Sequence, residues 1–183
     1  EVAYVVGHAD ISVMVCEDQE QTDKLLEARA SLPALRKIIV METKGLRSFS
    51  PEERALIIPF AEVEQLGAAS LAQPTIDAAL TAQTLNDIGL IIYTSGSTGK
   101  PKGAMLSWRN IRGVVPGIVE RLQLRRDSSH LSYLPLCHVA EQMLTSFVPP
   151  YLGSQVNFGE SIRTVQEDLR EVAPSIFLGV PRI

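Results

Sequence analysis

Apolar and polar residues alternate along the chain in blocks that predict strands followed by helices. The segments 11–16 and 37–41 are short and mostly apolar, as expected for strands that are covered on both faces. Between them, Asp18 and Gln21 have the spacing of a helix cap, and this helix ends before Pro33. The strand–helix–strand order predicts an α/β fold with a mostly parallel sheet layered with helices.

The middle of the chain carries weaker signals. A Ser-Pro pair at 50–51 is typical of a helix start, and alanine-rich stretches near 61–72 and 75–83 predict further helices. We interpret residues 42–87 as a connecting helical layer without chemistry. The apolar run at 90–93 then predicts a central strand of the sheet.

The second half continues the alternation. Residues 104–106 predict a short strand, and Ser107 is a suitable cap for a helix with apolar residues at helical spacing. We expect Pro116 and Gly117 to interrupt this helix as a kink. Further strands are predicted at 130–134, 155–158 and 175–178, with helices from about 139 and over 164–172.

A loop of small hydroxyl residues, glycines and lysines follows the strand at 90–93. Its glycines allow tight turns, and its hydroxyl and backbone N–H groups can donate several hydrogen bonds to one anion. Lys100 and Lys102 add positive charge, and Pro101 restricts the backbone between them. The combination predicts a site for the phosphates of a nucleotide. The residues that carry this prediction are Thr94, Ser95, Gly96, Ser97, Thr98, Gly99 and Lys102.

The loop departs from the common phosphate-binding motifs. The pattern G-x-x-x-x-G-K-[ST] requires glycine where Thr94 stands and a hydroxyl residue where Pro101 stands. The dinucleotide fingerprint also requires a glycine at Thr94, and the serine elbow of hydrolases has a different glycine spacing. An ordinary surface turn is the simple alternative, but it needs only about two to five residues. A different phosphate-binding family is therefore indicated.

Residues Tyr93 to Gly103 resemble the signature loop of the adenylate-forming enzymes, which include acyl-CoA synthetases, luciferases and peptide-synthetase adenylation domains. The stretches 131–141 and 168–183 are similar to the long-chain fatty acid branch of that family. The opening, residues 1–18, is similar to the segment that precedes the loop in this branch. The resemblance thus covers nearly the whole chain.

The resemblance implies that the chain is one part of a larger protein. Complete members are much longer, and this sequence begins at Glu1 without an initiator methionine and stops within a family motif at Ile183. We therefore expect residues 1–183 to be a partial N-terminal AMP-binding domain, truncated at both ends and without the C-terminal domain. The missing remainder of the chain is then a required partner, and this piece alone is expected to be inactive.

The activity implied by the resemblance is that of a long-chain fatty acid–CoA ligase. Such an enzyme activates a fatty acid with ATP to acyl-AMP and pyrophosphate and then forms acyl-CoA, so ATP, Mg²⁺ and CoA are expected. By resemblance, Thr94 contacts the magnesium, residues 95–99 wrap the phosphates, and Lys102 is catalytic. Two alternatives stay open: a ligase for another carboxylic acid, and a non-catalytic nucleotide-binding module.

His138 follows a turn-like Pro-Leu-Cys segment, where a structural histidine is the general expectation. The resemblance implies instead that His138 lines the acyl-substrate pocket and positions the acid. His138 and Glu141 also have the spacing of a metal pair, which is a weaker interpretation. Two positions depart from the family pattern: Trp108 replaces a histidine at the helix start, and Gln142 stands where some members have an aromatic gate to the acyl tunnel.

The composition of the chain limits which binding partners and which cellular compartment we expect. The formal net charge is −4 and the basic residues are dispersed, so no nucleic-acid partner is expected. Cys16 and Cys137 are too few for a disulfide framework and fit a reducing compartment. The apolar window 131–153 contains a charged residue and prolines and does not predict a membrane span. We expect a cytoplasmic protein that acts on fatty acid, ATP and CoA, with room for peripheral membrane contact.

Overall fold

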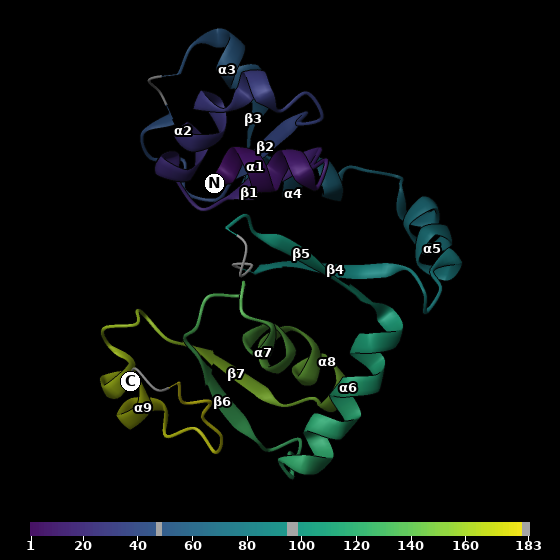
Figure 1. Ribbon diagram of the computed structural model, residues 1–183, viewed down its shortest axis with the longest axis vertical. Helices are drawn as coiled ribbons and strands as arrows, with labels where there is room; N and C mark the ends of the chain where they lie inside the picture. The colour runs from purple at the N-terminus through teal and green to yellow at the C-terminus, as the bar shows by residue number, and fades with distance from the viewer. Residues whose placement is uncertain (47–48, 95–98, 181–183) are drawn as a thin grey trace. The chain divides into compact units, whose positions relative to one another are not determined.

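The structure is a computed structural model, and it describes residues 1–46, 49–94 and 99–180 of the 183-residue chain. The chain divides into two compact units, Glu1–Ala82 and Gln83–Ile183 (Figure 1). Each unit combines strands with helices, so the predicted α/β class is confirmed.

The first unit is built on a three-stranded parallel sheet. Its strands, in their order across the sheet, are β1 (Val13–Cys16), β2 (Lys37–Val40) and β3 (Ile57–Pro59). Its helices are α1 (Val2–His8), α2 (Gln19–Glu27), the 3₁₀ turn η1 (Arg29–Ser31), α3 (Pro51–Leu56), α4 (Phe60–Ala68) and α5 (Gln73–Ala82). The order β1–α2–β2 is the predicted strand–helix–strand unit, whereas β3 was not predicted.

The core of the first unit lies on one face of its sheet. Ile38 and Val40 are fully buried there, together with Cys16 at the end of β1. Residues of a strand point alternately to opposite faces, so Val13 and Val15 point away from this core and are 48% and 51% exposed. The expectation that β1 is covered on both faces is therefore wrong for the described part of the chain.

The second unit contains one antiparallel hairpin and one parallel pair of strands. The hairpin is β4 (Ile88–Thr94) and β5 (Lys102–Ser107), and the pair is β6 (Ser129–Ser132) and β7 (Gln155–Phe158). The helices are α6 (Trp108–Arg121), α7 (Val139–Gln142), the π-helical turn η3 (Met143–Phe147), α8 (Val148–Leu152) and α9 (Val165–Val172). The predicted helices after residues 107, 139 and 164 are confirmed, and the π-helical turn was not predicted.

Two predictions about the hairpin and the helix that follows it were wrong. Among the described residues β4 pairs with β5 only, so it is one side of a hairpin rather than a central strand. Helix α6 continues through Pro116 and Gly117 instead of being interrupted there. The buried side chains of Ile111 and Val115 hold the helix on its apolar face, which compensates for the hydrogen bond that proline cannot donate.

The segment 175–178 also differs from its prediction, because it is not a strand. It makes a single parallel bridge to β6, between His130 and Ile176. Next to this bridge, Ser129 N donates to Ser175 Oγ over 2.8 Å, and Ser175 Oγ donates to Ser129 O over 3.1 Å. Together with the backbone bond from Ile176 N to Ser129 O (3.0 Å), these side-chain bonds keep the segment beside β6.

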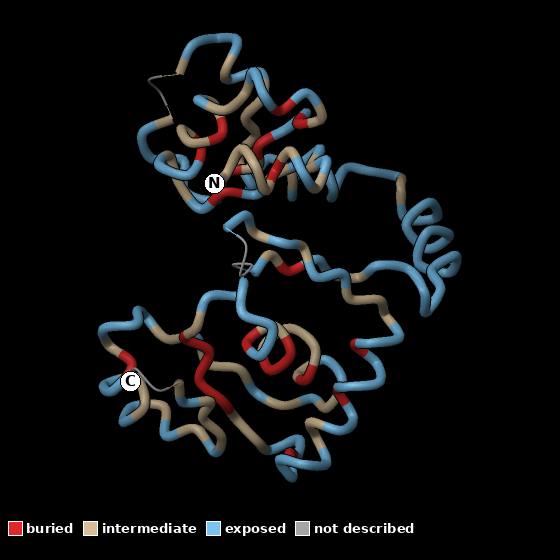
Figure 2. The backbone as a smooth tube through the Cα atoms, in the orientation of Figure 1, coloured by how far each residue is buried: buried red, intermediate tan, exposed pale blue. Residues whose placement is uncertain are grey.

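Strand β6 is the most deeply buried element of the second unit (Figure 2). Leu131 and Tyr133 pack with Val165 of α9, whereas His130, on the opposite face, bonds to Thr145 of η3. The strand is therefore covered on both faces. Among the described helices, none combines the length and apolarity that a membrane span requires.

Candidate functional site

The hairpin β4–β5 forms the two sides of the candidate phosphate loop. Thr94, the last residue of β4, lies opposite Lys102, the first residue of β5, and Tyr93 lies opposite Gly103. The hairpin thus brings together two residues that were predicted to bind the same nucleotide. Both residues are exposed, and no hydrogen bond or ion pair joins the side chain of Lys102 to another described residue. Its ammonium group is therefore accessible to an anion.

Four of the predicted phosphate ligands, Ser95, Gly96, Ser97 and Thr98, lie outside the described residues. Gly99 is described, and its φ angle is 98°. Residues with a β-carbon rarely adopt this backbone conformation, so the backbone itself favours glycine at this position. This is the kind of turn that the glycines of the loop were expected to provide.

Trp108 fixes the hairpin to α6. A β-carbon added at Gly89 of β4 would lie 2.9 Å from the indole ring, so the ring packs directly on the glycine backbone. On its other side the indole meets Phe147 edge-on, with the ring centroids 6.4 Å apart. The helix itself starts with a reciprocal cap, in which Ser107 N donates to Asn110 Oδ1 and Asn110 N donates to Ser107 Oγ. The replacement of the family histidine by Trp108 thus gives the hairpin a packed support.

A small apolar cleft lies next to the candidate acid-binding histidine. It has a volume of about 100 Å³ and is lined by Leu106, Asn110, Ile111, Val114, Val139 and Met143. His138 directly precedes Val139 and is the N-cap of α7, where its carbonyl oxygen accepts from Gln142 N over 3.0 Å. The exposed His138 therefore stands beside this cleft, and β5 connects Lys102 to the cleft through Leu106.

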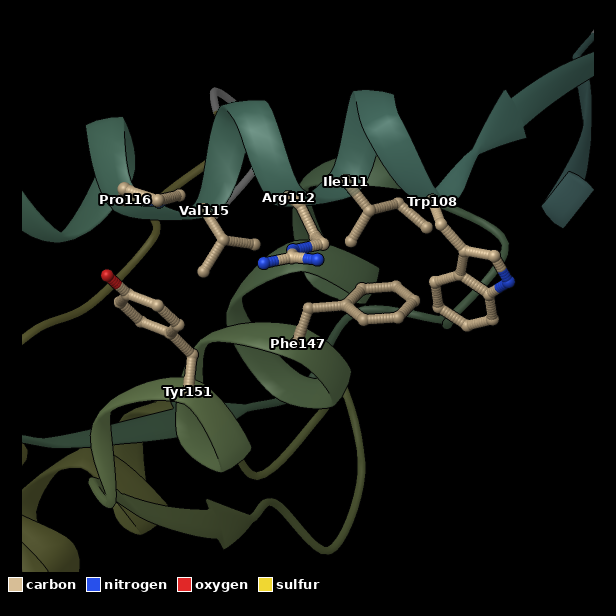
Figure 3. Close-up of a pocket in the computed structure, with 7 residues that line it drawn as sticks. All are labelled: Trp108, Ile111, Arg112, Val115, Pro116, Phe147 and Tyr151. Atoms are coloured by element: carbon tan, nitrogen blue, oxygen red, sulfur yellow. The ribbon is translucent and has the colours of Figure 1, made fainter. Parts of the chain in front are cut away.

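A larger cleft of about 420 Å³ lies between α6 and the segment η3–α8 (Figure 3). Phe147 and Tyr151 face α6 there, and the guanidinium of Arg112 points into the space between the helices. An acyl chain in this cleft would lie against a charged group, which is unfavourable unless the charge is paired. The smaller cleft has no charged residue in its lining, which includes Val139, the residue after His138.

A row of three polar side chains, two of them buried and one half-buried, lies between β6 and the helical segment that follows His138. We call His130, Thr145 and Glu141 the polar row. Thr145 Oγ1 donates to Glu141 Oε1 over 2.8 Å and lies 3.2 Å from His130 Nε2. Because the hydroxyl has one proton and directs it to Glu141, we assign the proton of the second bond to His130 Nε2. Glu141 is only 2% exposed and His130 only 9%.

The polar row corrects the interpretation of His138 and Glu141 as a metal pair. Glu141 is buried and bonded to Thr145, whereas His138 is an exposed helix cap. Within the described ranges there is also no group of three or more His, Cys, Asp or Glu residues that could hold a metal ion. Among the described residues of the loop, Thr94 offers a hydroxyl oxygen, and oxygen is the ligand atom that Mg²⁺ prefers.

Burial lowers the pKa of His130 below its ordinary value of 6.5, and the nearby Glu141 carboxylate partly opposes this shift. The unfolded chain then binds the proton more readily than the folded chain, so His130 favours folding above pH 6.5 and loses this contribution below it. We expect the unfolding temperature to fall as the pH is lowered from about 7 to about 5. Calorimetry should show a smaller fall in His130→Gln. An equal fall in both proteins would contradict this assignment.

The sequence pattern did not reveal the polar row. Its members come from a strand, a helix and a π-helical turn, and their contact depends on how these elements pack. The sequence offered a histidine within a predicted strand, at 130, and a glutamate at the start of a predicted helix, at 141. Such residues are usually exposed or bonded, but their partners cannot be identified without the fold.

The whole chain, residues 1–183, matches the family of AMP-binding enzymes, and the protein belongs to this family. The resemblance to the adenylate-forming enzymes is therefore confirmed. The chain is 32% identical over 191 residues to the long-chain-fatty-acid–CoA ligase ACSBG2 of Homo sapiens. The aligned region covers 98% of this chain and 27% of that protein. It thus spans about a quarter of the length of the curated relatives that it matches.

Solved structures share the fold. ATP-bound MatB from Rhodopseudomonas palustris has a TM-score of 0.70 at 24% identity, over 100% of this chain and 32% of that one. The anthranilate CoA ligase AuaEII in complex with anthranoyl-AMP also has a TM-score of 0.70, at 19% identity, over 97% of this chain and 32% of its own. At these identities the likeness establishes the architecture and not the substrate.

Proposed function

We propose that this chain is the phosphate-binding part of the N-terminal domain of a longer, ATP-dependent acid–thiol ligase of the AMP-forming type. The observation that carries the proposal is the pairing of Thr94 with Lys102 at the base of the candidate loop, in a chain of the AMP-binding family. The ATP-bound state of MatB, which has the same fold, supports ATP as the nucleotide.

The proposed reaction has two steps. The carboxylate of the acid attacks the α-phosphate of ATP and pyrophosphate leaves, and the thiol of CoA then displaces AMP from the acyl-adenylate. Negative charge gathers on the departing pyrophosphate, so donors already aimed at it stabilise the transition state more than they stabilise bound ATP. In this chain we assign that role to Lys102 and to residues 94–99. Mg²⁺, when bound, would neutralise part of the phosphate charge, with Thr94 as the contribution of this loop.

We further propose a long-chain fatty acid as the carboxylic substrate. Two observations support this choice: the 32% identity to a long-chain-fatty-acid–CoA ligase, and the apolar lining of the cleft beside His138. The cleft of about 100 Å³ is smaller than typical ligand pockets, which measure roughly 300–1,000 Å³, so it would hold only part of a long chain. An aryl acid is the second candidate, because AuaEII has the same fold in complex with anthranoyl-AMP.

The proposal is tested by exchange of labelled pyrophosphate into ATP, catalysed by the longer protein. We expect exchange that depends on hexadecanoate and is much weaker with anthranilate or acetate. Pyrophosphate exchange that occurs with anthranilate alone would support the same enzyme class but with an aryl acid as the substrate. Binding of ATP without exchange for any acid would contradict the enzyme assignment and favour the non-catalytic nucleotide-binding module.

Filling the apolar cleft should weaken acid binding selectively. Val114 lines this cleft and is 50% exposed, so Val114→Phe places a ring where we expect the acyl chain without disturbing a buried core. We expect the KM for hexadecanoate to rise about tenfold with the KM for ATP unchanged, since small changes in an apolar pocket are worth about 1–3 kcal/mol. Steady-state kinetics of the longer protein measures both constants.

Arg112→Phe is the matched control, because it adds the same ring two residues away, on the larger cleft. We expect it to change the KM for hexadecanoate by less than about twofold, as a surface substitution would. The opposite outcome, a raised KM in Arg112→Phe and an unchanged KM in Val114→Phe, would move the acid to the larger cleft.

A further inference from the structure

The polar row has no part in the chemistry proposed above, yet it lies deep in the second unit. Glu141 is 2% exposed, and a carboxyl group is kept at such a place only when it is bonded and held in position. Thr145, which joins the two other members, lies in the π-helical turn η3. Turns of this kind are rare and occur frequently at functional sites. Both features indicate a constraint beyond ordinary packing.

The polar row is anchored close to the candidate acid-binding residue. Glu141 lies in the first turn of α7, three residues after its N-cap His138, and Thr145 bonds this carboxylate one turn further along. His130 contributes the other end of the row from the centre of β6, which is packed on both faces. The row therefore ties the start of α7 to the most deeply buried strand of the unit.

Few other interactions hold this turn. His138 N donates to Pro135 O over 3.0 Å, and Gln142 N donates to His138 O over 3.0 Å. Both bonds lie within the segment itself, and residues 135–140 are exposed. In the described part of the chain, the polar row is thus the hydrogen-bonded link between this turn and the sheet.

We propose that the polar row positions His138 for the acid substrate: the bonds from His130 through Thr145 to Glu141 hold the first turn of α7 against β6 and so set where His138 stands. The proposal rests on the assignment of His138 to the acid in the proposed function. Members of the row are positioning residues, because none of them lines the apolar cleft.

Thr145→Val tests the proposal in the longer protein, since it removes the hydroxyl that joins the row and nearly keeps the shape. We expect the KM for hexadecanoate to rise about tenfold, less than the roughly 10²-fold loss that a 1 Å misplacement can cause. The KM for ATP should stay within about twofold, because no hydrogen bond joins the row to the described residues of the loop. Thr145→Ser keeps a hydroxyl and should restore the KM for hexadecanoate to within about twofold of the unaltered protein.

Hydrogen exchange provides a readout that does not depend on activity. In Thr145→Val we expect the amide of Gln142 to exchange faster, because its acceptor His138 O is less well held. The amide of Gly153, which donates to Pro149 O over 2.7 Å in α8, is the internal control and should not change. Unchanged exchange at Gln142 would overturn the proposal, whatever the kinetics show.

The combined outcomes separate this proposal from the proposed function. If no acid supports exchange of pyrophosphate in the unaltered protein, the proposed function fails, and hydrogen exchange still decides whether the row holds the turn. If the KM values for hexadecanoate and ATP rise together and the unfolding temperature drops, the row is a general structural element and the positioning role is refuted. A selective rise that Thr145→Ser reverses supports it.

Discussion

Replacement of Lys102 by alanine in the longer protein is expected to lower acid-dependent exchange of pyrophosphate into ATP by about 10²–10³-fold, the usual effect of removing one preorganised donor from a transition state. The lysine is exposed at the start of β5, and no other described residue bonds to its side chain. Its loss should therefore shift the unfolding temperature by no more than about 2 °C. Measuring both pyrophosphate exchange and unfolding temperature in this one variant thus distinguishes a role of Lys102 in phosphate binding from a role in folding.

Lys24→Ala is a suitable control for Lys102→Ala. Lys24 is also a lysine at the protein surface, half-buried rather than fully exposed, and it pairs with Glu20 over 2.8 Å on α2. Surface ion pairs of this kind contribute at most about 1 kcal/mol to folding stability. The exchange of pyrophosphate into ATP should therefore stay within about twofold of the unaltered protein. Equal activity in Lys102→Ala and Lys24→Ala would remove Lys102 from the site.

The second large effect is expected at Gly89, where β4 packs on α6. In Gly89→Ala the new β-carbon would lie 2.9 Å from the Trp108 ring, so the indole must move away from the hairpin and from Phe147. Overpacking of this kind costs about 1–3 kcal/mol of folding free energy. Denaturant unfolding of the longer protein should show the loss, and the KM for ATP should rise because the hairpin carries the loop.

Gly113→Ala is the matched control for Gly89→Ala. Gly113 lies inside α6, and nothing lies within 4 Å of a β-carbon added there. Alanine is the better helix former by about 0.8–1.0 kcal/mol, so this variant should gain stability by up to that amount. The same substitution is therefore expected to have opposite signs at two glycines. A loss at both positions, or at neither, would contradict the packing described for Trp108.

Local patterns predicted much of the secondary structure. The caps at Asp18 and Ser107 and the periodic helices after them depend on residues that are close in sequence, and the structure confirms both starts: Asp18 Oδ1 accepts from Gln21 N over 3.1 Å. The candidate loop was also predictable, because its glycines, hydroxyl groups and lysines are consecutive. The sequence did not show that the two ends of this loop are paired. The structure shows it, because the strand register places Thr94 opposite Lys102.

The remaining features depend on contacts between distant residues. An apolar run such as 90–93 predicts a strand but not its partners, and here the described partner is β5 alone. The segment 175–178 has strand-like residues, yet it forms a single bridge to β6, which serine side chains support. Trp108 was seen only as a departure from the family pattern, and its packing on Gly89 required the fold. The polar row was invisible for the same reason.

The most direct test of the central claim is a crystal structure of the longer protein with Mg²⁺ and a non-hydrolysable ATP analogue. We predict that the β- and γ-phosphates lie against residues 94–99, with the ammonium of Lys102 in contact with a phosphate oxygen. Nucleotide bound elsewhere, with this loop open to solvent, would contradict the account.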